Sequence, residues 1–170
     1  RQLAIAAIRE QAKNTQDLAE LAVSETGMGR VEDKFAKTSL RRAAHQALSA
    51  LPQVLTGDNG LTLIENAPWG VVASVTPSTN PAATVINNAI SLIAAGNSVI
   101  FARSGGEKVS QRAITLLNLA IVAAGGGNYW YRNNPDIETA QRLFKFRASA
   151  LVVTGGEAVV EAARNTPINV

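Results

Sequence analysis

Four short apolar segments, rich in β-branched residues, alternate with helical patterns in the second part of the chain. The apolar segments are Val71–Val75, Ser98–Ala102, Tyr129–Arg132 and Ala148–Thr154. The helical patterns between and after them cover residues 82–95, 107–124, 137–146 and 158–164. Strands that alternate with helices form βαβ units, whose right-handed crossovers build a parallel sheet. We therefore expect an α/β fold, a Rossmann-like doubly wound parallel sheet with helices on both faces, with strand order 3-2-1-4-5 and a fifth strand at residues 168–170.

The first part of the chain has a helical pattern instead. Periodic apolar residues predict helices over residues 2–12, 15–25 and 31–50, so that residues 1–60 form a helical N-terminal segment of one domain spanning residues 1–170. The first helix is expected to bury Leu3, Ala4, Ala7 and Ile8, with Ile5 at the margin. The third is expected to bury Val31, Phe35, Leu40, Ala43, Ala44 and Leu48. A turn at residues 57–60 leads into Leu61–Glu65, whose alternation is typical of a half-buried or edge strand.

Composition narrows the functions that such a domain can have. A net charge of +3, with Arg41-Arg42 as the only basic pair, offers no clustered surface for nucleic acid. The chain contains no cysteine, which excludes disulfides, thiolate metal ligands and a thiol nucleophile within it and is compatible with a reducing cytoplasm. No apolar run approaches the length of a membrane span, and Leu3–Ile8 lacks the layout of a signal peptide. His45 is the only histidine, so neither a metal cluster nor a catalytic triad can be assembled around it.

The strongest candidate for a ligand site lies where the first strand meets its helix. Thr76-Pro77-Ser78-Thr79-Asn80-Pro81 places hydroxyls and an amide between two prolines at this joint. In the expected order the first and fourth strands are neighbours, so Thr154-Gly155-Gly156-Glu157 lies at the same crevice beyond their carboxyl ends. The Asn80 amide could donate to a developing oxyanion, but Asn before a helix commonly acts as an N-cap, and Pro81 suits the first helical position. From the residues alone the cap interpretation is favoured.

Two glycine-containing turns are candidates for contacts with a nucleotide. Thr154-Gly155-Gly156 opens a helix, and a helix N-terminus attracts an anion such as a diphosphate. The chain lacks a complete GxGxxG fingerprint, so a well-formed turn is the simpler interpretation. Ser104-Gly105-Gly106 follows the second strand, where dinucleotide folds usually contact the adenosine ribose. Glu107 and Lys108 could contact ribose or phosphate there, although an exposed helix start explains them as well.

These features occur together in one known family. The resemblance is carried by Leu18–Lys37 (LAELAVSETGMGRVEDKFAK), Gln53–Ala102, Lys108–Ala124, Asn134–Phe146 and Leu151–Arg164 (LVVTGGEAVVEAAR), which cover most of the chain. In these stretches the chain resembles the coenzyme-A-acylating acetaldehyde dehydrogenases of bacterial ethanolamine utilization, a group within the aldehyde dehydrogenase superfamily.

The resemblance implies a reaction and a set of roles. Members of this family convert acetaldehyde, NAD and coenzyme A into acetyl-CoA and NADH through a cysteine thioester. Thr76, Pro77, Ser78 and Thr79 match the loop beneath the nicotinamide, and Asn80 matches the asparagine whose amide holds the substrate oxyanion. Thr154, Gly155, Gly156 and Glu157 match the segment that approaches the cofactor diphosphate, and Ser104 and Gly105 lie where adenosine is bound. The resemblance further implies a bacterial cytoplasmic protein associated with a microcompartment, with nucleotides as partners and a homo-oligomeric assembly.

The sequence also departs from this family. The catalytic cysteine domain is absent, and Arg103–Glu107 stands where the family has a loop containing Pro-His-Pro, which puts the expected adenosine and coenzyme A contacts in question. Further unfamiliar segments are residues 11–16, 38–51, 127–133, 147–150 and 165–170. We therefore expect an engineered or truncated NAD-binding portion of the enzyme that is inactive alone. The alternatives are a non-binding structural scaffold derived from that domain, and a half-enzyme whose partner chain supplies the cysteine.

Overall fold

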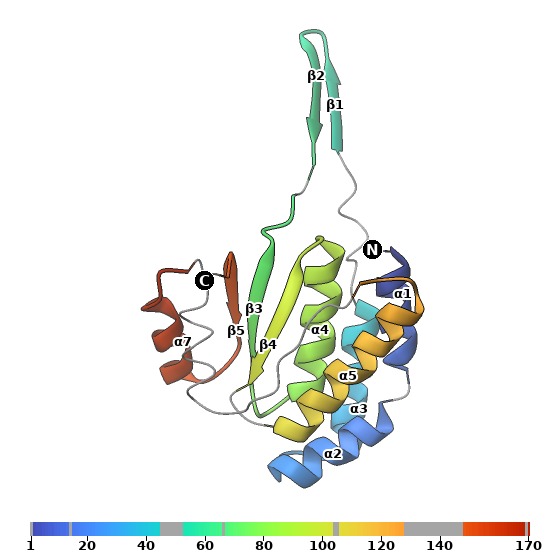
Figure 1. The fold of residues 1–170 in the computed structure, drawn as a ribbon, viewed down its shortest axis with the longest axis vertical. Coiled ribbons are helices and arrows are strands. Elements are labelled where there is room, and N and C mark those ends of the chain that lie inside the picture. Colours follow the sequence, from blue (N-terminus) through green and yellow to red (C-terminus); the bar gives the residue numbers. More distant parts are fainter. Residues whose placement is uncertain are drawn as a thin grey trace.

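The computed structural model describes residues 2–13, 15–44, 53–65, 67–103, 106–127, 148–168 and 170. The elements in chain order are α1 (Gln2–Gln11), α2 (Gln16–Thr26), α3 (Val31–Ala44), β1 (Gln53–Gly57), β2 (Gly60–Ile64), β3 (Val71–Thr76), α4 (Pro81–Ala94), β4 (Ser98–Arg103), α5 (Glu107–Ala123), β5 (Ala150–Val153) and α7 (Glu157–Arg164). Helices α1–α3 therefore precede a β-hairpin, and the hairpin precedes an alternation of strands and helices (Figure 1).

A parallel sheet in the order β4-β3-β5 organises the second part of the fold. β3 pairs with β4 from Val71↔Ser98 to Thr76↔Arg103, and with β5 from Val72↔Ala150 to Val75↔Val153. The first, second and fourth expected strands are thus neighbours in the predicted order, and the α/β class is confirmed. The strand expected at residues 129–132 and the helix at 137–146 lie outside the described residues.

The expected fifth strand at residues 168–170 is wrong as far as this segment is described. Ile168 lies in a bend that follows α7, and Val170 has no regular secondary structure. Instead of extending the sheet edge, the side chain of Ile168 packs against the small apolar core beside α7. Of the apolar residues that indicated a strand, Ile168 therefore serves packing, whereas Val170 is exposed.

Strand side chains alternate between two cores, one on each face of the sheet. Val99 and Phe101 of β4 pack with apolar side chains of α1, α2, α4 and α5. Ala73, Val75 and Leu151 pack with Ala163 of α7 instead. Because successive strand residues point to opposite faces, this division requires helices on both sides of the sheet. Figure 1 shows α7 on one side of the strands and α4, α5 and the N-terminal helices on the other, which confirms the doubly wound arrangement.

Two predicted helix faces are wrong in part. In α1 the buried residues are Ala4, Ile5 and Ile8, followed by Ala12 just after the helix, whereas Leu3 is 72% exposed. Ile5 is central because α1 packs against both α4 and α5. In α3 the side chains of Lys34 and Thr38 are buried, whereas Leu40 is 66% exposed. Lys34 and Thr38 are one turn apart and face the junction with α2 and the start of α4. The neighbours of the helix, rather than the hydrophobicity of its residues, therefore decide which face is covered.

A β-hairpin of β1 and β2 projects away from the body of the protein (Figure 1). Its strands pair antiparallel from Gln53↔Ile64 to Gly57↔Gly60, with the expected turn between them. The strand predicted at Leu61–Glu65 is therefore confirmed, but the helical N-terminal segment predicted for residues 1–60 is wrong from Gln53 onward. The apolar side chains that the hairpin exposes are Val54, Leu55, Leu61, Leu63 and Ile64.

Candidate functional site

The β3–α4 joint begins with a buried threonine and ends at a proline. The Thr76 hydroxyl donates to the Ala102 carbonyl oxygen on the neighbouring strand at 3.2 Å, which fixes the end of β3. Asn80 occupies the N-cap position of α4, and Pro81 is the first helical residue, as expected. The Asn80 carbonyl oxygen accepts from the Thr84 backbone N–H at 3.1 Å and from the Thr84 hydroxyl at 2.8 Å.

The cap interpretation of the Asn80 side chain is wrong, although its position at the helix start is right. The side chain makes no capping hydrogen bond. Its backbone has φ −142° and ψ 60°, whereas a capping residue usually has the extended backbone that brings its side-chain oxygen onto the first-turn N–H groups. The amide that sequence reasoning assigned to the helix is therefore available to a ligand.

The β5–α7 joint consists of backbone with little side-chain cover. The Thr154 N–H donates to the Val75 carbonyl oxygen at 3.1 Å, which attaches this joint to β3. Gly156 is the N-cap of α7, and its carbonyl oxygen accepts from Val159 and Val160. A Cβ atom on Gly155 would lie 3.2 Å from the Cβ atom of Val159, whereas one on Gly156 would meet nothing within 4 Å. The first N–H groups of any α-helix lack intrahelical partners, so the open side of Gly156 gives a ligand access to them.

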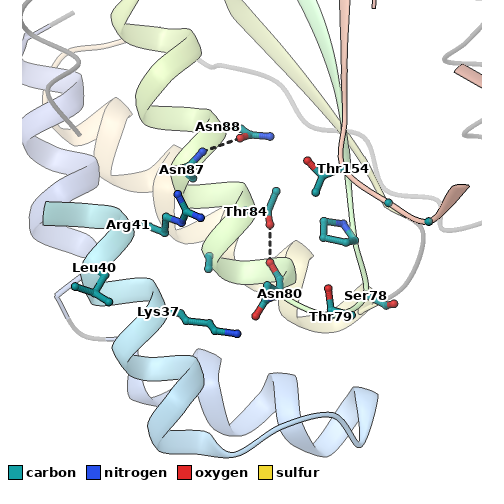
Figure 2. A pocket seen from close by; sticks show the side chains of 14 residues that line it. Lys37, Leu40, Arg41, Ser78, Thr79, Asn80, Thr84, Asn87, Asn88 and Thr154 are labelled. Atoms are coloured by element: carbon teal, nitrogen blue, oxygen red, sulfur yellow. Dashed lines mark hydrogen bonds between the residues drawn. The ribbon is translucent and has the colours of Figure 1, made fainter. Parts of the chain in front are cut away.

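These two joints line one cavity of about 750 Å³, which confirms that they converge as expected. Its lining comes from α3 (Lys37, Leu40, Arg41), the β3–α4 joint (Pro77–Asn80), α4 (Ala83, Thr84, Asn87, Asn88) and the β5–α7 joint (Thr154–Gly156). No carboxylate is among these lining residues, while two cations are. Figure 2 shows Lys37 and Arg41 reaching from α3 toward α4, with Thr154 on the opposite wall. Glu157, which was expected beside the diphosphate, opens α7 next to this cavity but does not line it.

Polar residues in the middle of α4 were missed by sequence reasoning. The Asn87 amide donates to the Asn88 side-chain oxygen at 3.0 Å (Figure 2). The Asn88 amide donates in turn to the Ser74 hydroxyl at 3.0 Å. Asn88 and Ser74 are both buried, so this bond ties the helix to the strand before it. A pair of asparagines inside an otherwise apolar helix was the signal that could have indicated them, because buried amides need partners.

A lysine of α3 was also missed. Lys34 is 9% exposed, and its ammonium donates to the Thr79 carbonyl oxygen in the β3–α4 joint. Burial lowers the pKa of the Lys34 ammonium, and the positive charge of Lys37 lowers that pKa further. The sequence contains no local signal for this contact, because Lys34 and Thr79 are 45 residues apart.

The start of α5 is already occupied by a carboxylate. Glu25, at the end of α2, accepts from the backbone N–H groups of Lys108 at 2.8 Å and Val109 at 3.0 Å. A nucleotide phosphate at this helix start would compete with Glu25 for the same donors. Gly106 before it has φ +66°, and a Cβ atom there would lie 2.9 Å from the Cγ atom of Pro81, so only glycine fits. Ser104 and Gly105, the expected adenosine contacts, lie outside the described residues.

Two other classes of site find no support in the part of the chain that the structure describes. No three His, Cys, Asp or Glu side chains gather there as they would around a metal ion. None of the described helices is long and apolar enough to cross a membrane. His45, the lone histidine, lies outside the described residues.

Comparisons with known proteins agree with this arrangement. Residues 2–162 match the model of the aldehyde dehydrogenase family. Acetaldehyde dehydrogenase (acetylating) EutE of Escherichia coli is 76% identical over 170 residues, which are 96% of this chain and 36% of that protein. The chain thus spans about a third of the length of the curated relatives that it matches.

Solved structures share the fold closely. Propionaldehyde dehydrogenase of Rhodopseudomonas palustris with bound CoA is 33% identical with a TM-score of 0.94, over 99% of this chain and 40% of that one. An engineered glycolyl-CoA reductase with bound NADP+ is 33% identical with a TM-score of 0.93, over 99% of this chain and 40% of the other.

Proposed function

This chain belongs to the aldehyde dehydrogenase family, and from that premise we propose that it is the NAD-binding part of a coenzyme-A-acylating acetaldehyde dehydrogenase. The complete enzyme would convert acetaldehyde, NAD and coenzyme A into acetyl-CoA and NADH. One observation carries the proposal: Pro77–Thr79 from the expected nicotinamide loop and Thr154–Gly156 from the expected diphosphate segment line the same cavity, although the chain separates them widely.

The residues of the cavity fit a dinucleotide. A volume of about 750 Å³ falls within the range of small-molecule sites, roughly 300–1,000 Å³. Gly155 and Gly156 would hold the diphosphate at the start of α7, where the helix dipole favours negative charge. Pro77–Thr79 would lie beneath the nicotinamide, which supplies the hydride acceptor of the reaction. Thr76, expected in the same loop, is buried and does not line the cavity. The Asn80 amide would then face the aldehyde oxygen and stabilise its negative charge.

The electrostatics of the cavity support an anionic ligand. Lys37 and Arg41 are one turn apart on α3 and both line the cavity, and no carboxylate among the lining residues opposes them. The ion pairs Lys13–Glu10 and Arg30–Asp33 include neither of these cations. Both NAD and coenzyme A carry phosphates that such cations attract.

The 170-residue chain is expected to bind NAD without turning over. It contains no cysteine, and the acylation step of this family needs a thiol to attack the aldehyde carbon and carry the acyl group to coenzyme A. NADH absorbance should therefore not rise in a mixture of the chain, acetaldehyde, NAD and coenzyme A. Turnover that persisted after exhaustive removal of host enzyme would overturn this part of the proposal.

A calorimetric titration with NAD tests the binding function directly. We expect saturable heat with one site per chain, and weaker binding at higher salt because the ligand is anionic. Parallel titrations with NADP and coenzyme A would rank the nucleotide ligands. Absence of heat with all three nucleotides would refute the binding function and leave the scaffold interpretation.

The departures from the family pattern belong to the same proposal. We infer that segments such as residues 127–133 and 165–170 were exchanged in an engineered or truncated form of the enzyme, because their residues depart from the family pattern. Peptide mapping that returned other residues at these positions would overturn this inference. On the resemblance, the parent enzyme works in the bacterial cytoplasm in association with a microcompartment, which localisation of a tagged full-length protein would test.

Self-association is proposed through the hairpin. β1 and β2 expose an apolar strip in which Leu61 and Leu63 alternate with polar residues, and an exposed strand edge pairs readily with another chain. Sedimentation velocity at rising concentration should show a dimer or higher species. Leu61→Lys with Leu63→Lys should return the monomer, whereas Leu119→Lys, an exposed leucine of α5, serves as control. A wild-type monomer at every concentration would contradict this assembly.

A further inference from the structure

A lysine is buried beneath the β3–α4 joint without a carboxylate to balance it. Lys34 is the only charged side chain among the buried polar residues that the structure describes. Its ammonium donates to the Thr79 carbonyl oxygen, and none of the described ion pairs includes it. Lysine is almost never buried unless it is paired, because removing an ammonium from water is costly. An apolar residue of similar length would avoid that cost, so stability alone does not account for this side chain.

The packing around Lys34 shows how its ammonium is delivered to the loop. Its backbone carbonyl oxygen accepts a hydrogen bond from the buried Thr38 hydroxyl at 2.9 Å, which gives this hydroxyl a partner inside the seam. The side chain crosses a seam between Leu18 and Ala22 of α2 and Pro81 of α4. The free volume of that seam is about 10 Å³, which leaves room for a single water at most. At its end the ammonium bonds directly to the Thr79 carbonyl oxygen.

Gly29 provides space for the same side chain. A Cβ atom on Gly29 would lie 3.3 Å from the Cε atom of Lys34, and its φ of +75° is one that glycine adopts readily. The glycine in the turn between α2 and α3 thus leaves room for the Lys34 side chain, as the packing along α3 does.

The contact acts on one particular peptide group. Thr79 immediately precedes Asn80, so Lys34 holds the peptide plane on the N-terminal side of Asn80. Thr84 holds the plane on the other side, since its N–H and hydroxyl both donate to the Asn80 carbonyl oxygen. With both planes held, the backbone sets the direction of the Asn80 Cα–Cβ bond, from which the amide extends.

We propose that Lys34 is a positioning residue that aims the Asn80 amide into the cavity by holding the Thr79 carbonyl oxygen. This inference rests on the proposed function, because a positioned amide matters only if it stabilises the negative charge of the substrate oxyanion. Lys34 touches neither cofactor nor substrate in this arrangement and acts only through the joint. A small misplacement of such a donor is costly for catalysis, which accounts for an otherwise unfavourable buried cation.

Carbon-detected NMR of the ligand-free chain tests the coupling without any variant. The Lys34 Cε and Asn80 Cγ resonances are followed as pH rises from 7 toward 11. Burial lowers the pKa of Lys34, and the charge of Lys37 lowers that pKa further. No other titratable side chain is among the residues that line the seam, which are Leu18, Ala19, Ala22, Thr38 and Asn80–Ala83. We expect the two resonances to move with one midpoint, below the ordinary lysine value. An Asn80 Cγ resonance that stayed constant while Lys34 titrated would overturn the proposal.

Two variants sharpen the same test. Lys34→Met keeps the length of the side chain and removes the donor, so the Asn80 Cγ resonance should shift and lose its pH dependence. Lys34→Arg keeps a cationic donor and should restore most of the wild-type resonance. Lys13→Met removes an exposed lysine from the turn after α1 and should change neither. A wild-type Asn80 resonance in folded Lys34→Met would contradict the proposal.

Binding provides a separate readout. If the chain binds NAD, Lys34→Met should weaken binding about tenfold, because Lys34 also holds the Pro77–Thr79 segment that is proposed to lie beneath the nicotinamide. Lys34→Arg should recover that binding. Equal affinity of wild type and Lys34→Met would count against the proposal. If the wild type shows no binding heat, the NAD-binding function fails while the ligand-free NMR test of Lys34 still decides the positioning role.

Discussion

The β3–α4 joint and the β5–α7 joint face the same cavity, but they are built in opposite ways. The β3–α4 joint is held by side chains: Thr76 bonds to β4, Lys34 to Thr79, and Thr84 to Asn80. The β5–α7 joint has two glycines, and a side chain added at Gly156 would meet open space. The difference indicates two separate roles. The β3–α4 joint holds the polar side chain of Asn80 in place, and the β5–α7 joint presents backbone N–H groups to a ligand.

The largest expected effect is that of a substitution in the β5–α7 joint. Gly156→Val should weaken NAD binding by roughly thirtyfold or more, because its side chain would occupy the space in which the diphosphate approaches the start of α7. Unfolding by urea should change little, since φ is −72° there and a Cβ atom has no neighbour within 4 Å. Calorimetry with NAD and urea unfolding measure both quantities. An undiminished affinity would show that the ligand does not approach this helix start.

The next largest effect concerns the hydrogen bond between α4 and β3, the two elements that the β3–α4 joint connects. Asn88→Ala should lower the free energy of unfolding by about 1–3 kcal/mol, because it leaves the buried Ser74 hydroxyl without its amide donor. Ser74→Ala should cost less when combined with Asn88→Ala than alone, since both variants remove the same bond. A double-mutant cycle in urea measures this coupling. Strict additivity would show that the bond contributes nothing to the joint.

A smaller effect concerns pH. The folded pKa of Lys34 lies below that of an unfolded lysine, so the cost of burying its charge is fully present below the folded pKa and disappears as pH rises toward about 10.5. The unfolding free energy of the wild type should therefore rise relative to that of Lys34→Met between neutral pH and pH 10. Parallel urea titrations at several pH values measure this difference. A difference that is constant with pH would mean that burial does not lower the pKa of Lys34 in the folded chain.

The smallest expected effect is that of Asn80→Ala. Because the Asn80 side chain makes no capping bond, stability should change by no more than about 0.5 kcal/mol, not by the roughly 1 kcal/mol typical of a lost cap. NAD affinity should also be nearly unchanged, since the amide would serve an oxyanion that a chain without cysteine does not generate. Urea unfolding and calorimetry check both. A loss of about 1 kcal/mol would restore the cap interpretation and weaken the comparison of the two joints.

Much of the fold could be predicted from local pattern. Apolar strands such as Val71–Val75 alternate with helices, and this alternation implies a parallel sheet in which the first and fourth strands are neighbours. The convergence of Asn80 and Gly156 on one crevice follows from that topology. The prediction failed where a residue's partners, rather than its type, decide its place: Leu3 and Leu40 are exposed, and residues 53–57 pair with β2 as a strand.

By itself the sequence determined the α/β class, the order of three neighbouring strands and the two joints at their carboxyl ends, because periodicity and turn residues act over a few positions. Only the tertiary structure decided how each joint is held. Lys34 reaches Thr79 across 45 residues, Glu25 reaches the start of α5 across 83, and Asn88 finds Ser74 on a strand. Each of these contacts gives a polar group a partner that no local pattern specifies, so it exists only once the helices have packed.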